Sequence, residues 1–419
     1  MQNNLNETAV LVGLNLQGNK DQIVSSLKEL QGLAETAGVE VADIITQNRS
    51  VPHPATFFGK GKIRYIADRS LELKARVIIC DQELTPAQLR NLERILEIKV
   101  IDRTQLILDI FAQRAQTKEG KLQVELAQLN YLLPRLTGQG GEMSRLGAGI
   151  GTRGPGETKL ETDRRRIRQR VNDLKKELAE VQKHRQLHRQ KRQNVPFPLV
   201  SLVGYTNAGK STLLNALTGS EVLVEDKLFA TLDPTTRRVE LPTKETILMT
   251  DTVGFIQNLP HHLVAAFRAT LEEVVEADLL LHVVDASNPY YEDQIKAVEE
   301  VLDSLNALTK QKILVYNKVD KVKDVLVGGT EPGNYYSNPV EISAQERKGL
   351  KQLLVQISHA LSDNRVHGKL FIPFKNTSVI SLLHRHGKVL REEYKGNGVE
   401  VEFEINKIWE RRIKKELEQ

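Results

Sequence analysis

The stretch that decides the fold of this chain is GYTNAGKS, residues 204–211, which follows the apolar run PLVSLV and continues into STLLNALTG. A glycine-rich turn between a strand and a helix exposes backbone N–H groups that cradle phosphates. In this motif the lysine reaches the β and γ phosphate oxygens, and the serine hydroxyl ligates Mg²⁺. The candidate nucleotide-binding residues are Gly204, Tyr205, Thr206, Asn207, Ala208, Gly209, Lys210 and Ser211, with Lys210 also a catalytic candidate and Ser211 a metal ligand.

A second motif, DTVG at residues 251–254, ends another apolar run, ETILMT. A carboxylate at this place can hold Mg²⁺ through water, and a glycine N–H can contact the γ-phosphate. Alone, this motif is a weak signal. Its candidate residues are Asp251, Thr252, Val253 and Gly254, of which Gly254 is also a catalytic candidate.

A third motif, NKVD at residues 317–320, follows the apolar run KILVY, and SAQ lies downstream at residues 343–345. The Asp320 carboxylate can accept hydrogen bonds from both N1–H and the exocyclic amine of guanine, a donor pair that adenine lacks. The remaining base-site candidates are Asn317, Lys318, Val319, Ser343, Ala344 and Gln345. Together the three motifs predict guanine nucleotide binding.

Between the first two motifs lies FATLDPTTR, residues 229–237, a polar stretch with a proline and no strand pattern. This is where a switch segment is expected, with a threonine hydroxyl that completes Mg²⁺ coordination and closes over the γ-phosphate. Three threonines compete for that role, Thr231, Thr235 and Thr236. The candidates for contact with the nucleotide are Phe229, Ala230, Thr231, Leu232 and Asp233.

The length of 419 residues and the order of periodic segments predict a multidomain α/β protein. Strands alternate with helices from residue 9 to about residue 111, which indicates a small α/β domain with a largely parallel sheet. The prolines of QNVPFP mark a boundary near residue 195, and a small α and β module follows the central domain. The expected domains are residues 1–115, 116–194, 195–366 and 367–419.

The region 116–194 is expected to be a helical hairpin, because its leucines and other apolar residues repeat at spacings of three and four. Between the two helical stretches lies a segment with eight glycines, residues 137–157. Residues 151–194 contain fourteen Lys or Arg and six acidic residues, a net charge of +8 in a chain whose total is +5. Such a surface favours contact with RNA phosphates, although a solvated helix face and a flexible linker are the plain alternatives.

The sequence argues against a membrane-spanning or a secreted protein. No apolar run approaches the roughly 18 residues that a spanning helix needs, and the N-terminal residues lack the pattern of a signal peptide. The single cysteine, Cys80, lies in an apolar strand pattern and cannot form an internal disulfide. A cytoplasmic protein with no integral membrane association is therefore expected.

The sequence resembles the HflX family of GTPases, within the Obg-HflX group. The resemblance covers nearly the whole chain and includes PATFFGKGK, LPRLTGQGGEMSRLGAGIGTRGPGETKLETDRRRIRQR, GYTNAGKST, FATLDPTTR, DTVGFI and NKVD. It implies an N-terminal α/β domain with a helical hairpin, a Ras-like GTPase domain and a small C-terminal α+β domain. It also implies binding to the large (50S) ribosomal subunit and its rRNA, and splitting or rescue of stalled ribosomes, with GTP hydrolysis driving release.

The resemblance also selects Thr231 as the second Mg²⁺ ligand, and Thr231 and Asn207 are the remaining catalytic candidates. It likens Asn207 to the asparagine of potassium-activated GTPases, so K⁺ is a candidate second cation beside Mg²⁺. Where many GTPases have a glutamine after the DxxG glycine, this chain has Phe255, which cannot polarise water. Slow intrinsic hydrolysis, raised by the ribosome, is therefore expected.

Two alternatives stay open at this point. One is a GTPase in ribosomal subunit assembly or rRNA remodelling, and the other is a GTP-dependent binding module without useful turnover. The expected partners are GTP or GDP and the large subunit, but not DNA, and the chain is expected to be a monomer.

Overall fold

The computed structural model describes residues 7–16, 18, 20–136, 155–192, 197–219, 228–256, 271–322, 336–362, 365–406, 410 and 413. Two compact units divide the chain. The first contains Met1–Arg185, Leu223–Pro234 and Val253–Glu272, and the second contains Gln186–Val222, Thr235–Thr252 and Glu273–Gln419. The glycine-rich segment expected at residues 137–157 lies outside the described residues up to residue 154.

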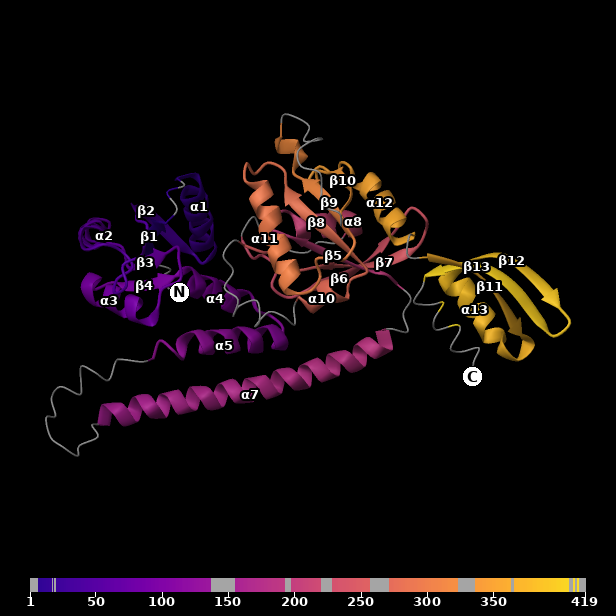
Figure 1. Cartoon of the computed structure of the whole chain (residues 1–419), viewed down its shortest axis with the longest axis horizontal. Helices are drawn as coiled ribbons and strands as arrows, with labels where there is room; N and C mark the ends of the chain where they lie inside the picture. The colour runs from indigo at the N-terminus through magenta and orange to yellow at the C-terminus, as the bar shows by residue number, and fades with distance from the viewer. Residues whose placement is uncertain are drawn as a thin grey trace, which may run out of the picture. The chain divides into compact units, whose positions relative to one another are not determined.

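The first unit contains a four-stranded sheet in the order β2-β1-β3-β4, and all its neighbouring strands are parallel. This arrangement confirms the parallel α/β domain expected from the alternation of strands and helices (Figure 1). Cys80 is fully buried on β3, where burial raises the pKa of its thiol. The elements are β1 (Glu7–Asn15), α1 (Lys20–Thr36), β2 (Val39–Asn48), α2 (Lys60–Glu72), β3 (Val77–Cys80), α3 (Pro86–Leu96), β4 (Lys99–Asp102) and α4 (Arg103–Arg114).

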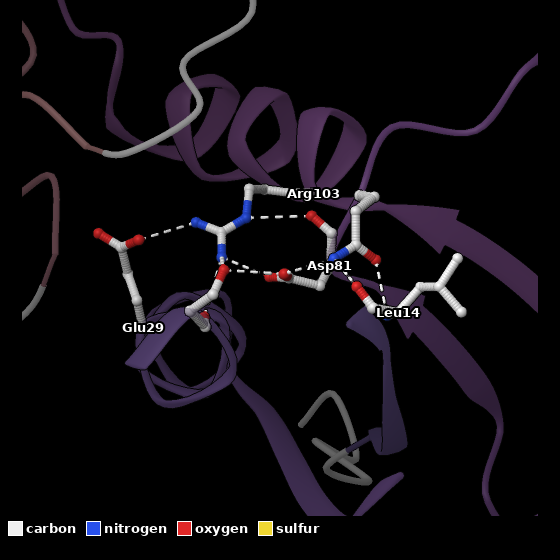
Figure 2. A network of polar contacts seen from close by, with 6 residues as sticks. Leu14, Glu29, Asp81 and Arg103 are labelled. Carbon is white, nitrogen blue, oxygen red and sulfur yellow. Dashed lines mark hydrogen bonds and ion pairs between the residues drawn. The ribbon is translucent and has the colours of Figure 1, made fainter. Parts of the chain in front are cut away.

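A buried ionic network closes the carboxyl ends of these strands (Figure 2). The guanidinium of Arg103 donates to the Asp81 carboxylate over 2.5 Å and to the Glu29 carboxylate over 2.9 Å. It also donates to the backbone oxygens of Asp81 and Ser26. A buried charge of this kind is tolerated because hydrogen bonds compensate it, and the network joins α4 to α1 and to the end of β3.

The expected helical hairpin is present. Helix α5 (Lys118–Leu132) and helix α7 (Pro155–Arg192) run antiparallel, side by side (Figure 1). Arg170 and Glu125 form an ion pair between them at 2.7 Å. Their apolar contact consists of Leu122, Leu174 and Leu178, with Leu126, Leu129 and Val181 packed around it.

The C-terminal end of α5 is fastened to the sheet of the first unit through Asp102. The Tyr131 hydroxyl donates to Asp102 Oδ1 over 2.8 Å, and Arg135 donates to Oδ2 over 3.3 Å. The same carboxylate accepts from the backbone of Gln105 and so caps α4. Asp102 therefore links three helical and strand elements, and α5 belongs structurally to the N-terminal sheet.

The second unit contains a six-stranded sheet in the order β10-β9-β8-β5-β7-β6. All its pairs are parallel except β6 with β7. Its elements are β5 (Leu199–Gly204), α8 (Lys210–Thr218), β6 (Thr235–Glu240), β7 (Thr246–Asp251), α10 (Glu272–Glu276), β8 (Leu279–Asp285), α11 (Tyr291–Ser304), β9 (Lys312–Asn317), β10 (Tyr336–Glu341) and α12 (Leu350–Ser362).

One strand of this sheet has no pattern in the sequence. The stretch 229–237 is polar and shows no strand pattern, but Thr235 begins strand β6. Strand β6 pairs with β7 alone and lies at the edge of the sheet, and Val239 is its only buried residue. An edge strand with one buried side chain can be polar, so it lacks the apolar alternation that marks a strand in sequence.

A three-stranded antiparallel sheet in the order β11-β13-β12 follows. It contains β11 (Arg365–Pro373), β12 (Gly387–Lys395) and β13 (Gly398–Asn406), and helix α13 (Thr377–His386) covers one face (Figure 1). Val401 and Phe403 of β13 are buried with Leu383 of α13. The expected small α+β module is confirmed. Within the part of the chain that the structure describes, no helix is long and apolar enough to span a membrane.

Candidate nucleotide site

The loop after β5 requires glycine at two positions. Gly204 has a φ of +150°, and a Cβ there would lie 2.2 Å from the carbonyl oxygen of Val283. Gly209 has a φ of +95°, and a Cβ there would lie 2.2 Å from Nδ2 of Asn317. Any side chain at either position would collide with a neighbouring strand end, so the glycines allow the close approach of backbone that a phosphate loop needs.

Lys210 begins α8 and is buried under this loop. Its ammonium donates to the carbonyl oxygens of Gly204 over 3.1 Å and Tyr205 over 2.8 Å, so the loop wraps around it. Burial lowers the pKa of Lys210 to about 8, with Asp251 opposing and Lys318 adding to the shift. A buried cation with a depressed pKa favours an anionic ligand, because an anion would restore the charged form.

The hydroxyl and carboxylate expected at the metal site lie in contact. Ser211 Oγ donates to Asp251 Oδ2 over 2.6 Å, which joins the start of α8 to the end of β7. The next residue, Thr252, donates from its hydroxyl to the carbonyl oxygen of Leu202 over 2.6 Å and fixes the end of β7 beside β5. Oxygen donors of this kind suit Mg²⁺.

Asn317 joins the two loops of base-site residues to the phosphate loop. Its side chain, 2% exposed, donates from Nδ2 to the Ala208 carbonyl over 2.9 Å. Its Oδ1 accepts from the backbone N–H of Ala344 over 3.0 Å. The structure therefore brings the loop 204–211, the loop 317–320 and the loop 343–345 together at one sheet edge.

The other base-site residues fall around this centre. Asp320 is exposed in a short 3₁₀ turn, so its carboxylate is accessible to a base. Ser343 is buried, and its hydroxyl accepts from the backbone N–H of Glu346 over 3.1 Å, whereas Gln345 is exposed. Val319 packs against the apolar cluster between β8 and β9.

Sequence reasoning missed one residue of this site. Asp285, the last residue of β8, accepts from the Lys318 ammonium over 2.7 Å. A signal for it existed, since Asp285 ends an apolar strand as Asp251 does, and the carboxyl ends of neighbouring parallel strands meet at one edge.

The segment 228–234 belongs to the first unit, and there it contacts α4 and α5. Phe229 is buried and packs edge to face on Phe111, with ring centroids 4.7 Å apart. The Asp233 carboxylate accepts from the backbone N–H groups of Gln116 over 3.0 Å and Thr117 over 2.9 Å, and from the Thr117 hydroxyl over 2.5 Å. Asp233 is thus bonded to the N-terminus of α5, a contact that no sequence pattern predicted.

The remaining candidates of these two stretches differ in burial. Ala230 and Thr231 are half-buried, whereas Leu232 is buried. After β7, the residues Val253 and Gly254 are buried, and so is Phe255. A buried aromatic ring at position 255 cannot orient a water molecule through a hydrogen bond.

The strand, the glycine loop closed by Lys210 and Ser211, Asp251 on the neighbouring strand and the Asn317-centred base loops define a P-loop GTPase. The family models agree with this class. Residues 199–318 match "50S ribosome-binding GTPase", residues 24–112 match "GTP-binding GTPase N-terminal" and residues 114–192 match "GTP-binding GTPase Middle Region". The chain belongs to the HflX family of GTPases.

Two relatives named GTPase HflX support this membership over almost the full length. The GTPase HflX of Caldanaerobacter subterraneus is 49% identical over 95% of this chain and 91% of its own length. The GTPase HflX of Escherichia coli K12 is 47% identical over 88% of this chain and 86% of its own length. A GTP-binding protein from Sulfolobus solfataricus, solved in complex with GDP, is 25% identical over 84% of this chain and 98% of that chain, with a TM-score of 0.46.

Proposed function

We propose that this chain is a monomeric, cytoplasmic GTPase that binds the large ribosomal subunit and splits or rescues stalled ribosomes, and that GTP hydrolysis drives its release. The observation that carries the proposal is that one chain contains both the candidate guanine site around Asn317 and the strongly basic helix α7. The printed description of the family that matches residues 199–318, "50S ribosome-binding GTPase", supports the choice of partner.

Guanine recognition is assigned to Asp320, whose exposed carboxylate would accept from N1–H and the exocyclic amine of the base. Asn317 is assigned the role of holding the base loops against the phosphate loop, and its hydrogen bonds to Ala208 and Ala344 support this role. The stem of Lys318 would cover one face of the purine. The backbone of residues 343–345 would meet the guanine O6.

Phosphate binding is assigned to Lys210 and the backbone of residues 204–211. Mg²⁺ would be held by Ser211 and Thr231, with Asp251 acting through water, and when bound it would neutralise phosphate charge. The Ser211–Asp251 hydrogen bond supports this assignment, since it gathers oxygen donors beside Lys210. Lys210 would pair with the β and γ oxygens, and the Gly254 N–H would contact the γ-phosphate.

Hydrolysis is proposed to be slow without a ribosome. Phe255 is buried and apolar, so this position offers no group to position water. A partner that supplies the missing group would complete the site, as partner binding does when it assembles a catalytic arrangement. Asn207 is proposed to help hold K⁺, whose charge would add to that of Mg²⁺.

Helix α7 is the proposed rRNA contact. Its side chains Arg165, Arg166, Arg168, Lys175 and Lys176 are exposed, whereas Arg170 is engaged with Glu125 and Glu177. Exposed lysines and arginines on one helix suit a phosphate backbone.

The proposed partner is tested by sedimentation with 70S ribosomes and GMPPNP. The chain should move 70S particles into 50S and 30S fractions and travel with 50S. The triple variant R165E/R166E/R168E should lose this ability, whereas K296E on α11, an equally exposed charge reversal, should keep it. Binding only to immature large subunits would favour the assembly function instead.

A further inference from the structure

Asp285 lies where three strand ends of the nucleotide site meet. In the sheet register, Asp285 at the end of β8 stands beside Asn317 at the end of β9. On the other side, β8 pairs with β5, whose last residue, Gly204, begins the phosphate loop. The carboxylate therefore stands at the same sheet edge as the phosphate loop and the base loop, yet it belongs to none of the motifs that define them.

The carboxylate of Asp285 is oriented by its own turn. Oδ1 accepts from the backbone N–H of Ser287 over 3.0 Å and from the Ser287 hydroxyl over 2.6 Å. The Asp285 carbonyl oxygen accepts from Asn288 N–H over 3.2 Å and closes the turn. These bonds engage one carboxylate oxygen and aim the other, Oδ2, at the Lys318 ammonium 2.7 Å away. The acceptor is thus oriented independently of the lysine it binds.

The Lys318 side chain needs a partner that holds its ammonium in one position. Its backbone adopts a left-handed conformation, with φ 63° and ψ 31°, which is unusual for a residue with a long side chain. A free lysine side chain samples many rotamers, and fixing it costs conformational entropy. The ion pair is shielded from water, with side-chain exposures of 20% for Lys318 and 18% for Asp285, so it is stronger than a fully exposed pair.

We propose that Asp285 is a positioning residue of the guanine site: it holds the Lys318 ammonium so that the methylene stem forms a fixed wall against the purine ring. This inference rests on the proposed guanine recognition by residues 317–320. Asp285 acts through Lys318 and does not itself contact the nucleotide.

The test is a double-mutant cycle on the full chain, read by equilibrium binding of a fluorescent GDP. D285N should weaken GDP binding about tenfold, because a shielded, charge-assisted hydrogen bond is lost. K318M removes the ammonium but keeps an apolar stem, and it should weaken binding by a similar factor. The double variant D285N/K318M should bind no more weakly than K318M alone. D293N removes the same charge from an exposed site on α11 and should bind GDP as the parent does.

A kinetic reading separates positioning from catalysis. D285N should raise KM for GTP while leaving kcat at saturating GTP unchanged, since the wall contacts the base in ground and transition states alike. S287A keeps every charge and the backbone hydrogen bond to Oδ1 but removes the hydroxyl one, so it should weaken GDP binding about threefold. It is the variant to use if D285N fails to fold.

Three results would overturn the inference: GDP affinity unchanged in D285N and S287A, losses that multiply in the double variant, or a fall in kcat equal to the rise in KM. Failure of the parent chain to bind GDP would instead defeat the guanine site itself. The two failures are therefore distinguishable from one set of titrations.

Discussion

The hydroxyl of Ser211 donates a 2.6 Å hydrogen bond to the carboxylate of Asp251, which joins the first turn of α8 to the last residue of β7. Both side chains are proposed to hold Mg²⁺, Ser211 directly and Asp251 through water. Replacing Ser211 by alanine should lower Mg²⁺-dependent GTP hydrolysis about 100-fold, since a direct ligand is lost. The measurement is kcat across a Mg²⁺ titration.

The matched control for this prediction is S304A, because Ser304 is exposed at the end of α11 and its hydroxyl donates to the Val301 carbonyl within the same helix end. It should leave the Mg²⁺ titration unchanged. GDP binding without Mg²⁺ should be similar in S211A and the parent. An S211A variant with the parent's Mg²⁺ dependence would remove Ser211 from the metal site.

The depressed pKa of Lys210 predicts a pH effect on nucleotide affinity. Burial lowers this pKa from an ordinary 10.5 to about 8, and bound phosphates should raise it again. GDP binding then takes up a proton at pH values above about 8, so affinity should fall about fourfold between pH 7 and pH 8.5. Isothermal titration at both pH values measures it, and K210M, which cannot titrate, should show a flatter profile.

The lowered pKa of Lys210 also predicts how the stability of the fold changes with pH. The unfolded chain holds a proton on Lys210 up to about pH 10.5, whereas the folded, nucleotide-free chain loses it near pH 8. The Lys210 contribution to the free energy of unfolding should therefore rise with pH between these values and fall as pH drops through 8. Denaturant unfolding of the parent and K210M across this window tests the sign, and a steeper rise in K210M than in the parent would contradict it.

The bond between Asp233 and the N-terminus of α5 predicts a local stability effect. Asp233 accepts three hydrogen bonds from Gln116 and Thr117. Thr117 is also the N-cap of α5, because its hydroxyl accepts from the backbone N–H of Gly120. T117V should lower the local stability of the first turn of α5 by about 1 kcal/mol, whereas T117S, which keeps the hydroxyl, should be close to the parent. Hydrogen–deuterium exchange of a peptide covering residues 117–123 measures the difference.

Gly120 provides an independent test of the same contact. A Cβ at Gly120 would lie 2.6 Å from Asp233 Oδ1, so G120A should displace the carboxylate and speed exchange at residues 117–123. At Gly61, in the first turn of α2, a Cβ would meet nothing within 4 Å. G61A should therefore be neutral or slightly stabilising. Equal exchange in G120A and the parent would show that Asp233 does not sit against α5 in solution.

Potassium dependence is expected from the proposed role of Asn207. Asn207 is exposed in the phosphate loop with a φ of 60°, so its side chain lies on the accessible side of the loop. GTP turnover should be faster in K⁺ than in Na⁺ at equal ionic strength, and N207A should be insensitive to the change. Equal rates in both salts for the parent chain would eliminate the K⁺ site.

Much of the architecture was predictable because its signals are local. Buried strands such as β5 and β9 are continuous apolar runs, and the glycines and lysine of the phosphate loop stand at fixed spacing. The hairpin of α5 and α7 followed from leucine periodicity and is confirmed by their packing. The domain boundaries near residues 116, 195 and 367 stay predictions.

What sequence could not supply were contacts between residues far apart in the chain. Asp233 and Thr117 are separated by more than a hundred residues, and Asp285 and Lys318 by thirty-three. Neither pair carries a periodicity or a spacing rule. The polar edge strand β6 was not recognised in the sequence for a related reason. Its pairing with β7, rather than any pattern of its own, makes it a strand.

The central claim is tested most directly by GTP turnover of the purified chain with and without mature large ribosomal subunits, in potassium buffer. A strong rise in kcat with the subunit is predicted, because the ribosome is proposed to supply the water-positioning group that buried Phe255 cannot. Unchanged turnover despite tight GTP binding would contradict the account.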